Sequence, residues 1–219
     1  MNIPANITNI KARIAAACFK VGRSPDSVSL IAVTKGRDIE QINEAAKSGI
    51  TDIGENRVQE ALLKYSVIKA SVKWHMVGHL QTNKVKDAVR IFDLIHSVDG
   101  LPLAQEINKQ ATKINKVQDI LLEVKTSPEA TKFGITPDDI VSVYRATAKF
   151  NNLRVKGLMT IAPAADDPKQ ARPYFRQLRN IRDGIDKHLV LSMGMSDDYE
   201  VAIEEGADII RIGRALFEG

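Results

Sequence analysis

The sequence of 219 residues is poor in several features, and each lack excludes a class of protein. Cys18 is the single cysteine, so no internal disulfide can form and nothing favours an oxidising compartment. The apolar runs are only a few residues long, too short to cross a membrane. Polar residues near the N-terminus, such as Asn2, Asn6 and Asn9, are atypical of a signal peptide. We therefore expect a cytoplasmic protein.

Aromatic residues make up only 5% of the sequence, and the formal net charge is +4. A basic protein can bind nucleic acid, but here basic residues are scattered among acidic ones and few aromatic rings remain for stacking on bases. We interpret the charge as a solvated surface, which would also suit a small polyanionic ligand. No nucleic-acid or membrane partner is expected.

Segments typical of helices and strands alternate along the chain. An amphipathic helix comes first, because apolar residues recur every three or four positions at Ile3, Ile7, Ile10, Ile14, Cys18 and Val21. Eight strands are then predicted, at residues 30–34, 52–54, 74–78, 94–98, 120–124, 155–160, 189–193 and 209–213. Seven helices are predicted between them, at residues 39–48, 58–69, 82–90, 101–116, 138–150, 168–185 and 198–205.

This alternation predicts an α/β protein, a (β/α)8 TIM barrel formed by residues 1–219 as a single domain. The main alternative, a doubly wound open sheet, is disfavoured because G-x-G-x-x-G does not follow the first strand. Only six residues follow Gly213, too few for a full helix after the last strand. We therefore expect the extra N-terminal helix to cover the surface left open there.

Lys35 follows the first predicted strand and precedes Gly36. In a barrel of this kind, chemistry collects at the carboxyl ends of the strands, where this lysine would lie. Burial there would lower the lysine pKa and leave free amine to condense with an aldehyde as a Schiff base. The plainer alternative is a strand-end lysine whose amine reaches water.

Glycine and hydroxyl groups gather near the ends of the last two strands. Gly194 and Ser196 stand just before the last predicted helix, and Gly213 follows the last strand. A glycine-rich turn leading into a helix offers backbone N–H groups and the positive end of the helix dipole, which suit a phosphate. Ser196 could equally be an ordinary N-cap, and Arg214 either adds charge or is a solvated arginine.

His75 and His79 are four residues apart, a spacing that invites a metal site. On a strand, however, they would lie more than about 10 Å apart, at about 3.3 Å per residue, too far to share a zinc ion. No third ligand is suggested, so no metal is predicted. We interpret His79 as a pocket-lining residue and His75 as a core or wall histidine.

Seven motifs occur in order between residues 29 and 217: AVTK at 32–35, IGENRVQE at 53–60, WHMVGHLQTNK at 74–84, HSVD at 96–99, GLMTIAP at 157–163, LSMGMSDDYE at 191–200 and IRIG at 210–213. Together they resemble the YggS-like (PROSC/PLPBP-type) family of pyridoxal phosphate homeostasis proteins. The resemblance implies a fold-type III barrel like the N-terminal domain of alanine racemase. It also implies that pyridoxal 5'-phosphate (PLP) is held as a Schiff base on Lys35.

The same resemblance assigns further contacts to the cofactor. Arg211 would lie near the pyridine nitrogen, and Asn56 would face the cofactor. The phosphate would be met by Ser196 and by the backbone around Gly213 and Arg214, although members of the family often carry Thr or Ser in place of that arginine. The full predicted cofactor-binding set is Lys35, Asn56, His79, Met193, Ser196, Arg211, Gly213 and Arg214.

Two functions from different classes remain. The first is a PLP carrier that acts in vitamin B6 homeostasis and amino-acid balance without catalytic turnover, as a monomer, with PLP-dependent apoenzymes as candidate recipients. The second is a PLP-dependent amino-acid racemase, which needs acid–base groups on both faces of the substrate. Racemases of this fold take their second group, a tyrosine, from another domain, and an arginine at the pyridine nitrogen weakens the ring as an electron sink. The four tyrosines here all fall in predicted helices: Tyr65, Tyr144, Tyr174 and Tyr199. We therefore favour the carrier.

Overall fold

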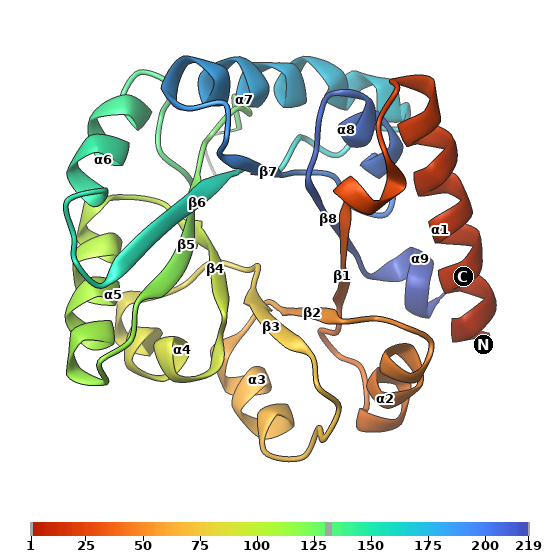
Figure 1. Cartoon of the computed structure of the whole chain (residues 1–219), viewed down its shortest axis with the longest axis horizontal. Helices are drawn as coiled ribbons and strands as arrows, with labels where there is room; N and C mark the ends of the chain where they lie inside the picture. Colours follow the sequence, from red (N-terminus) through yellow and green to blue (C-terminus); the bar gives the residue numbers. More distant parts are fainter. Residues whose placement is uncertain (1, 130–132, 219) are drawn as a thin grey trace.

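The computed structural model describes residues 2–129 and 133–218. Within these ranges, eight parallel strands close into a barrel in which each strand pairs with the next and β8 pairs with β1 (Figure 1). The predicted (β/α)8 fold is therefore confirmed. The strands are β1 (Ser29–Val33), β2 (Asp52–Glu55), β3 (Lys73–Met76), β4 (Leu94–Val98), β5 (Gln118–Glu123), β6 (Leu153–Met159), β7 (Val190–Ser192) and β8 (Ile209–Ile212).

Helices surround the barrel on its outer side, as Figure 1 shows. They are α1 (Ile3–Lys20), α2 (Ile39–Lys47), α3 (Val58–Tyr65), α4 (Val85–Ile91), α5 (Leu101–Lys113), α6 (Ile140–Thr147), α7 (Arg172–Ile185), α8 (Tyr199–Glu204) and α9 (Arg214–Phe217). The described residues also form 3-10 turns after α1 and before α4 and α7, namely η1 (Pro25–Ser27), η2 (Thr82–Lys84) and η3 (Pro168–Ala171). None of the helices in the described ranges combines the length and apolar character that spanning a membrane requires.

Helix α1 fills the place of a full eighth helix, as expected. It packs against α2, α8 and the four-residue α9, and Figure 1 shows it beside the last two. Its buried face includes Ile7 and Ile14, and the amide of Asn6 donates to the carbonyl of Leu216 at 3.1 Å. An ion pair between Arg13 and Glu200 joins α1 to α8 on the surface.

Several helix boundaries differ from the predicted ones. The segment predicted as one helix at 168–185 divides into η3 and α7, because Pro173 lies in the first turn of α7 and has no N–H to continue the hydrogen bonds of the preceding turn. The helix predicted at 138–150 begins only at Ile140, after a turn in which the Asp139 N–H donates to the hydroxyl of Thr136. The helix predicted at 58–69 ends at Tyr65.

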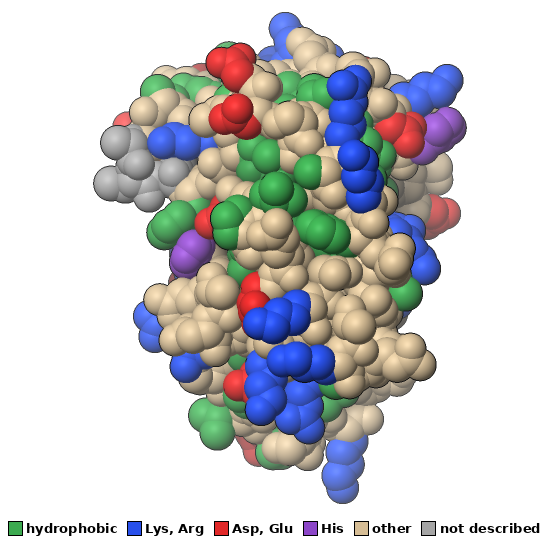
Figure 2. Space-filling view, turned by 90° about the vertical axis from the view of Figure 1, so that its left-hand side faces the viewer, with side chains coloured by type: hydrophobic (Ala, Val, Ile, Leu, Met, Phe, Trp, Pro, Cys, Tyr) green, Lys and Arg blue, Asp and Glu red, His purple; other side chains and the backbone are tan. Residues whose placement is uncertain are grey.

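Charged side chains are interspersed on the face at α5 and α6. Figure 2 shows Lys and Arg side chains there among acidic and uncharged surface. This arrangement agrees with our interpretation of the net charge as a solvated surface.

Candidate functional site

Lys35 lies two residues beyond the end of β1, at the carboxyl end of the barrel. Strand β1 pairs with β8 through Ile31 and Arg211, so Lys35 follows the strand that lies next to the one carrying Arg211. Its side chain is exposed. The hypothesis that this lysine is buried is therefore wrong, and the plainer alternative, a strand-end lysine whose amine reaches water, is confirmed: the strand ends at Val33, and the chain turns at Gly36, which has φ +68°.

The backbone just before Lys35 is held by a buried ammonium group. Lys64 of α3 donates from Nζ to the Thr34 carbonyl at 2.6 Å and to the carboxylates of Glu55 and Glu60 at 2.8 and 2.7 Å. The hydroxyl of Thr34 also donates to Glu55, at 2.6 Å. Burial raises the pKa of Glu55, although the hydrogen bonds from Lys64 and Thr34 oppose this.

The backbone just after Lys35 is held by the same cluster. Gly36 has φ +68°, a left-handed conformation that suits glycine, and its N–H donates to Glu60 at 2.5 Å. The peptide is therefore bonded on both sides of the lysine. We did not predict this cluster, because Glu60 and Lys64 are four residues apart on a helix and such a pair usually lies in solvent.

Arg211 projects from β8 into the barrel and is buried. Its guanidinium donates to the hydroxyl of Ser192 at 2.6 Å and to the carbonyl of Thr160 at 2.9 Å. Burial lowers its pKa to about 10, with the carboxylates of Asp198 and Glu123 opposing the shift. The guanidinium therefore stays charged at neutral pH and is oriented by two acceptors.

The loop after β7 meets the start of α9. The hydroxyl of Ser196 accepts a hydrogen bond from the N–H of Ala215 at 3.3 Å, so this serine lies beside the turn at Gly213. Arg214 is exposed and forms an ion pair with Asp197. The structure thus brings together the predicted phosphate residues, while the charge of Arg214 already has a surface partner.

Met193 and Gly194 lead into this loop. Met193 is buried, and Gly194 has φ +95° in a place where a Cβ would come within 2.9 Å of the Tyr199 Cα. The N-cap of α8 is Asp198 rather than Ser196. The alternative of Ser196 as an ordinary N-cap is therefore wrong, and its hydroxyl belongs to the contact with α9.

Asn56 and His79 line a cavity of about 290 Å³ beyond the ends of β2, β3 and β5. The His79 ring stacks on Phe133 at 3.7 Å between centroids, and its Nδ1 lies 3.5 Å from Asp99. Glu123 also lines this cavity, and burial, together with the charge of Asp99, raises its pKa to about 7. His79 is thus pocket-lining, as we predicted.

His75 is buried in the barrel interior, as we predicted for a core histidine. Its ring contacts Asp52 and His96, whereas His79 faces Asp99. Among the described residues, no group of three or more His, Cys, Asp or Glu side chains is placed to hold a metal ion.

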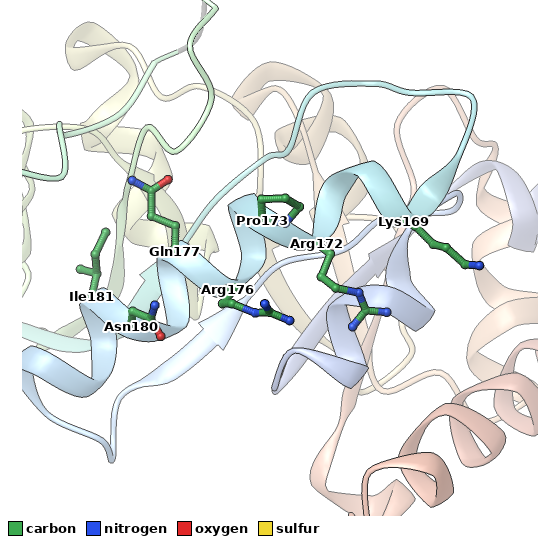
Figure 3. A pocket seen from close by; sticks show the side chains of 7 residues that line it. All are labelled: Lys169, Arg172, Pro173, Arg176, Gln177, Asn180 and Ile181. Atoms are coloured by element: carbon green, nitrogen blue, oxygen red, sulfur yellow. The ribbon is translucent and has the colours of Figure 1, made fainter.

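A larger groove of about 620 Å³ runs along the outer side of α7 (Figure 3). Its arginines are already paired, since Arg172 and Arg176 lie 2.8 and 3.0 Å from the carboxylate of Glu205. None of the predicted site residues lines this groove. The strand ends, which hold the amine of Lys35 and the buried guanidinium of Arg211, are therefore the better candidate site.

Known proteins are similar to this chain over nearly its whole length. Residues 5–219 match the family model described as the alanine racemase N-terminal domain. A pyridoxal phosphate homeostasis protein of Aquifex aeolicus is 44% identical over 223 residues, covering 99% of this chain and 98% of that protein. PipY of Synechococcus elongatus PCC7942, solved with PLP bound, is 33% identical with a TM-score of 0.87, covering 99% of this chain and 100% of PipY.

A more distant match is alanine racemase of Clostridium difficile 630, with a TM-score of 0.78 and 15% identity. It covers 98% of this chain but only 58% of the racemase, and at this identity it supports the fold alone. The full-length match at 44% identity and the matching family model leave one assignment. The chain belongs to the pyridoxal phosphate homeostasis protein family and has the fold of the alanine racemase N-terminal domain.

Proposed function

We propose that this chain binds PLP as a Schiff base on Lys35 and acts in PLP, or vitamin B6, homeostasis and amino-acid balance rather than in catalytic turnover. The observation that carries the proposal is the fixed backbone around Lys35, with hydrogen bonds at the Thr34 carbonyl and the Gly36 N–H. A fixed backbone with an exposed side chain presents a primary amine at a defined place without burying it. PLP, when bound, supplies the aldehyde that this amine can capture.

The donor groups near Lys35 fit the rest of such a ligand. Arg211 can donate to an unprotonated ring nitrogen, because a guanidinium has donors only. Ser196 offers a hydroxyl, and a Cβ placed on Gly213 would come no nearer than 3.5 Å to any other residue, so backbone there is open to approach. Asn56 and His79 would lie at the opposite wall, with Met193 packed beneath the loop.

A carrier is favoured over a racemase by the groups that flank the site. All four tyrosines lie on helices outside the barrel, in α3, α6, α7 and α8. None of these four supplies a second acid–base group opposite Lys35. Arg211, with a pKa of about 10, would also keep its proton rather than give it to a ring nitrogen, which leaves the ring a weak electron sink.

We extend the proposal to the setting in which the protein works. The chain would act as one cofactor-binding domain and as a monomer, with PLP-dependent apoenzymes as recipients. A cytoplasmic location is supported by the buried, unpaired Cys18, which forms no disulfide.

The proposal is tested by trapping the cofactor on the protein. The purified protein is incubated with PLP, its visible absorption spectrum is recorded, and the adduct is reduced with borohydride and mapped by peptide analysis. We expect the adduct on Lys35, its loss in Lys35→Ala, and its retention in Lys47→Ala, which changes an exposed lysine of α2. An adduct found mainly on another lysine would refute the assignment.

Incubation with L-amino acids in deuterated water separates the carrier from the racemase. For a carrier we expect no exchange of the α-proton beyond that produced by free PLP. Steady deuterium incorporation with formation of the D-isomer, abolished by Lys35→Ala, would establish the racemase instead.

A further inference from the structure

A chain of hydrogen bonds crosses the barrel interior and ends at Arg211. Asp52 Oδ1 lies 2.9 Å from His75 Nε2, His75 Nδ1 lies 3.0 Å from His96 Nε2, and His96 Nδ1 lies 2.9 Å from Ser192 Oγ. Arg211 then donates to Ser192 Oγ at 2.6 Å. These five side chains come from β2, β3, β4, β7 and β8, and we call them the interior chain.

The two ends of the interior chain fix its direction when both histidines are neutral. Asp52, as a carboxylate, only accepts, so His75 must donate from Nε2 and accept at Nδ1. His96 must then donate from Nε2 and accept at Nδ1, which requires the hydroxyl of Ser192 to donate to it. Arg211 only donates, so the remaining lone pairs of Ser192 accept from it. Each contact is satisfied by one arrangement of hydrogens.

The charges along the interior chain support this arrangement. Burial, with the neighbouring His75 and Arg211, holds the pKa of His96 well below its ordinary value, so that ring is neutral. Burial alone would raise the pKa of Asp52, but hydrogen bonds from His75 and Thr51 leave it below the ordinary value, so the carboxylate is ionised. The one-way arrangement requires both this ionised Asp52 at its end and the neutral His96 beside Ser192.

Burying polar side chains in the barrel costs desolvation free energy, which apolar side chains would avoid. A TIM barrel is ordinarily filled by branched apolar side chains, and buried polar groups stabilise it only when every partner is in place. Here three successive strands each give one polar side chain to the interior, and all of them lead toward the guanidinium of Arg211. This convergence indicates a role beyond packing.

We infer that Asp52, His75 and His96 are positioning residues that commit the Ser192 hydroxyl as an acceptor for Arg211, and so hold the guanidinium for the ring of bound PLP. This inference rests on the proposed function, because the ligand that it invokes is PLP. The interior chain itself is a property of the protein and can be tested without PLP. The residues act through Ser192 and do not touch the cofactor.

The first test measures the histidine tautomers by two-bond ¹⁵N–¹H correlation spectra of the cofactor-free protein at neutral pH. We expect His96 to carry its proton on Nε2. Asp52→Leu removes the fixed acceptor at the end of the chain, so its His96 should no longer be held as the Nε2–H tautomer and should populate Nδ1–H. The matched control is Thr51→Val, which removes only the outer hydrogen bond to Asp52 and should leave the tautomer unchanged. A native His96 with its proton on Nδ1, or no response to Asp52→Leu, would overturn the one-way chain.

The second test measures the visible absorption band and the dissociation constant of bound PLP. His96→Phe leaves Ser192 without its acceptor, so we expect a shifted band and roughly tenfold weaker binding, as for one lost charge-assisted hydrogen bond. His188→Phe changes an exposed histidine and should match the native protein. An unchanged band and affinity in His96→Phe would overturn the positioning role.

The two outcomes separate this inference from the proposed function. If the native protein forms no adduct on Lys35, the proposed function fails, and with it the role toward PLP. If the native protein binds PLP and His96→Phe binds it identically, only the positioning role fails. The tautomer measurement on the native protein needs no variant, so misfolding of a variant does not remove the test.

Discussion

Glu123 gives the protein a stability that depends on pH. It lies at the end of β5 facing the cavity, and burial, together with the charge of Asp99, raises its pKa from 4.5 to about 7. Because the folded pKa is the higher one, the folded state keeps a proton that the unfolded state releases. The contribution of protonated Glu123 to the free energy of unfolding is therefore present in full below about pH 4.5 and is lost as the pH rises through 7. A difference of about 2.5 pH units corresponds to about 3 kcal/mol, at about 1.36 kcal/mol per unit.

Replacing this residue, in Glu123→Gln, should remove the pH dependence that it causes. At pH 8 we expect the free energy of unfolding of the variant, compared with that of the native protein, to be higher by up to about 3 kcal/mol than the same comparison at pH 4.5 gives. The reason is that the amide never ionises. The measurement is urea unfolding of the cofactor-free proteins at both pH values. Glu44→Gln, on the exposed side of α2, is the control and should show no such gain. A Glu123→Gln effect that is the same at both pH values would refute the reasoning.

Three further variants test the site. Lys64→Met removes the partner of buried Glu55, so urea unfolding should show a loss of about 3 kcal/mol; a loss below about 1 kcal/mol would contradict the buried pair. Gly213→Ala places a Cβ no nearer than 3.5 Å to Val33, so stability should hold while PLP is lost faster on dialysis; unchanged retention would count against a phosphate contact there. Lys35→Ala should lose the covalent absorption band but keep some PLP through the phosphate contacts, which equilibrium dialysis would detect; complete loss of binding would contradict those contacts.

The fold could be predicted from the sequence because its signals are local. Alternating strand and helix patterns fix the number and order of the units, and the N-terminal helix carries its apolar face in its own spacing. Helix ends were less accurate. The turn before Pro173 has the composition of the helix that follows it, and the division appears only because a proline cannot donate to the preceding turn.

The candidate site was predicted in part. Lys35 and the glycines near Gly213 are marked by their place at strand ends, and the resemblance added Arg211. The exposure of Lys35 was one of two alternatives left open, because a run of apolar residues says nothing about where the chain turns after its last member. The cluster at Lys64 was missed because a Glu60–Lys64 pair on a helix usually lies in solvent, and only the closed barrel brings α3 against the end of β1, where Thr34 lies.

A polar residue inside an otherwise apolar strand can predict a buried hydrogen bond from the sequence alone. Asp52, His75 and His96 each lie in a short strand on a segment that is otherwise mostly buried. One such residue is easily explained by an exposed edge, but in a closed barrel of parallel strands there is no edge, and a buried polar group without a partner costs about 1–3 kcal/mol. Polar residues in successive strands therefore predict hydrogen bonds to one another. Arg211 is the charged group at the end of the interior chain, so the side chains that orient it can be predicted from the polar residues of the other strands.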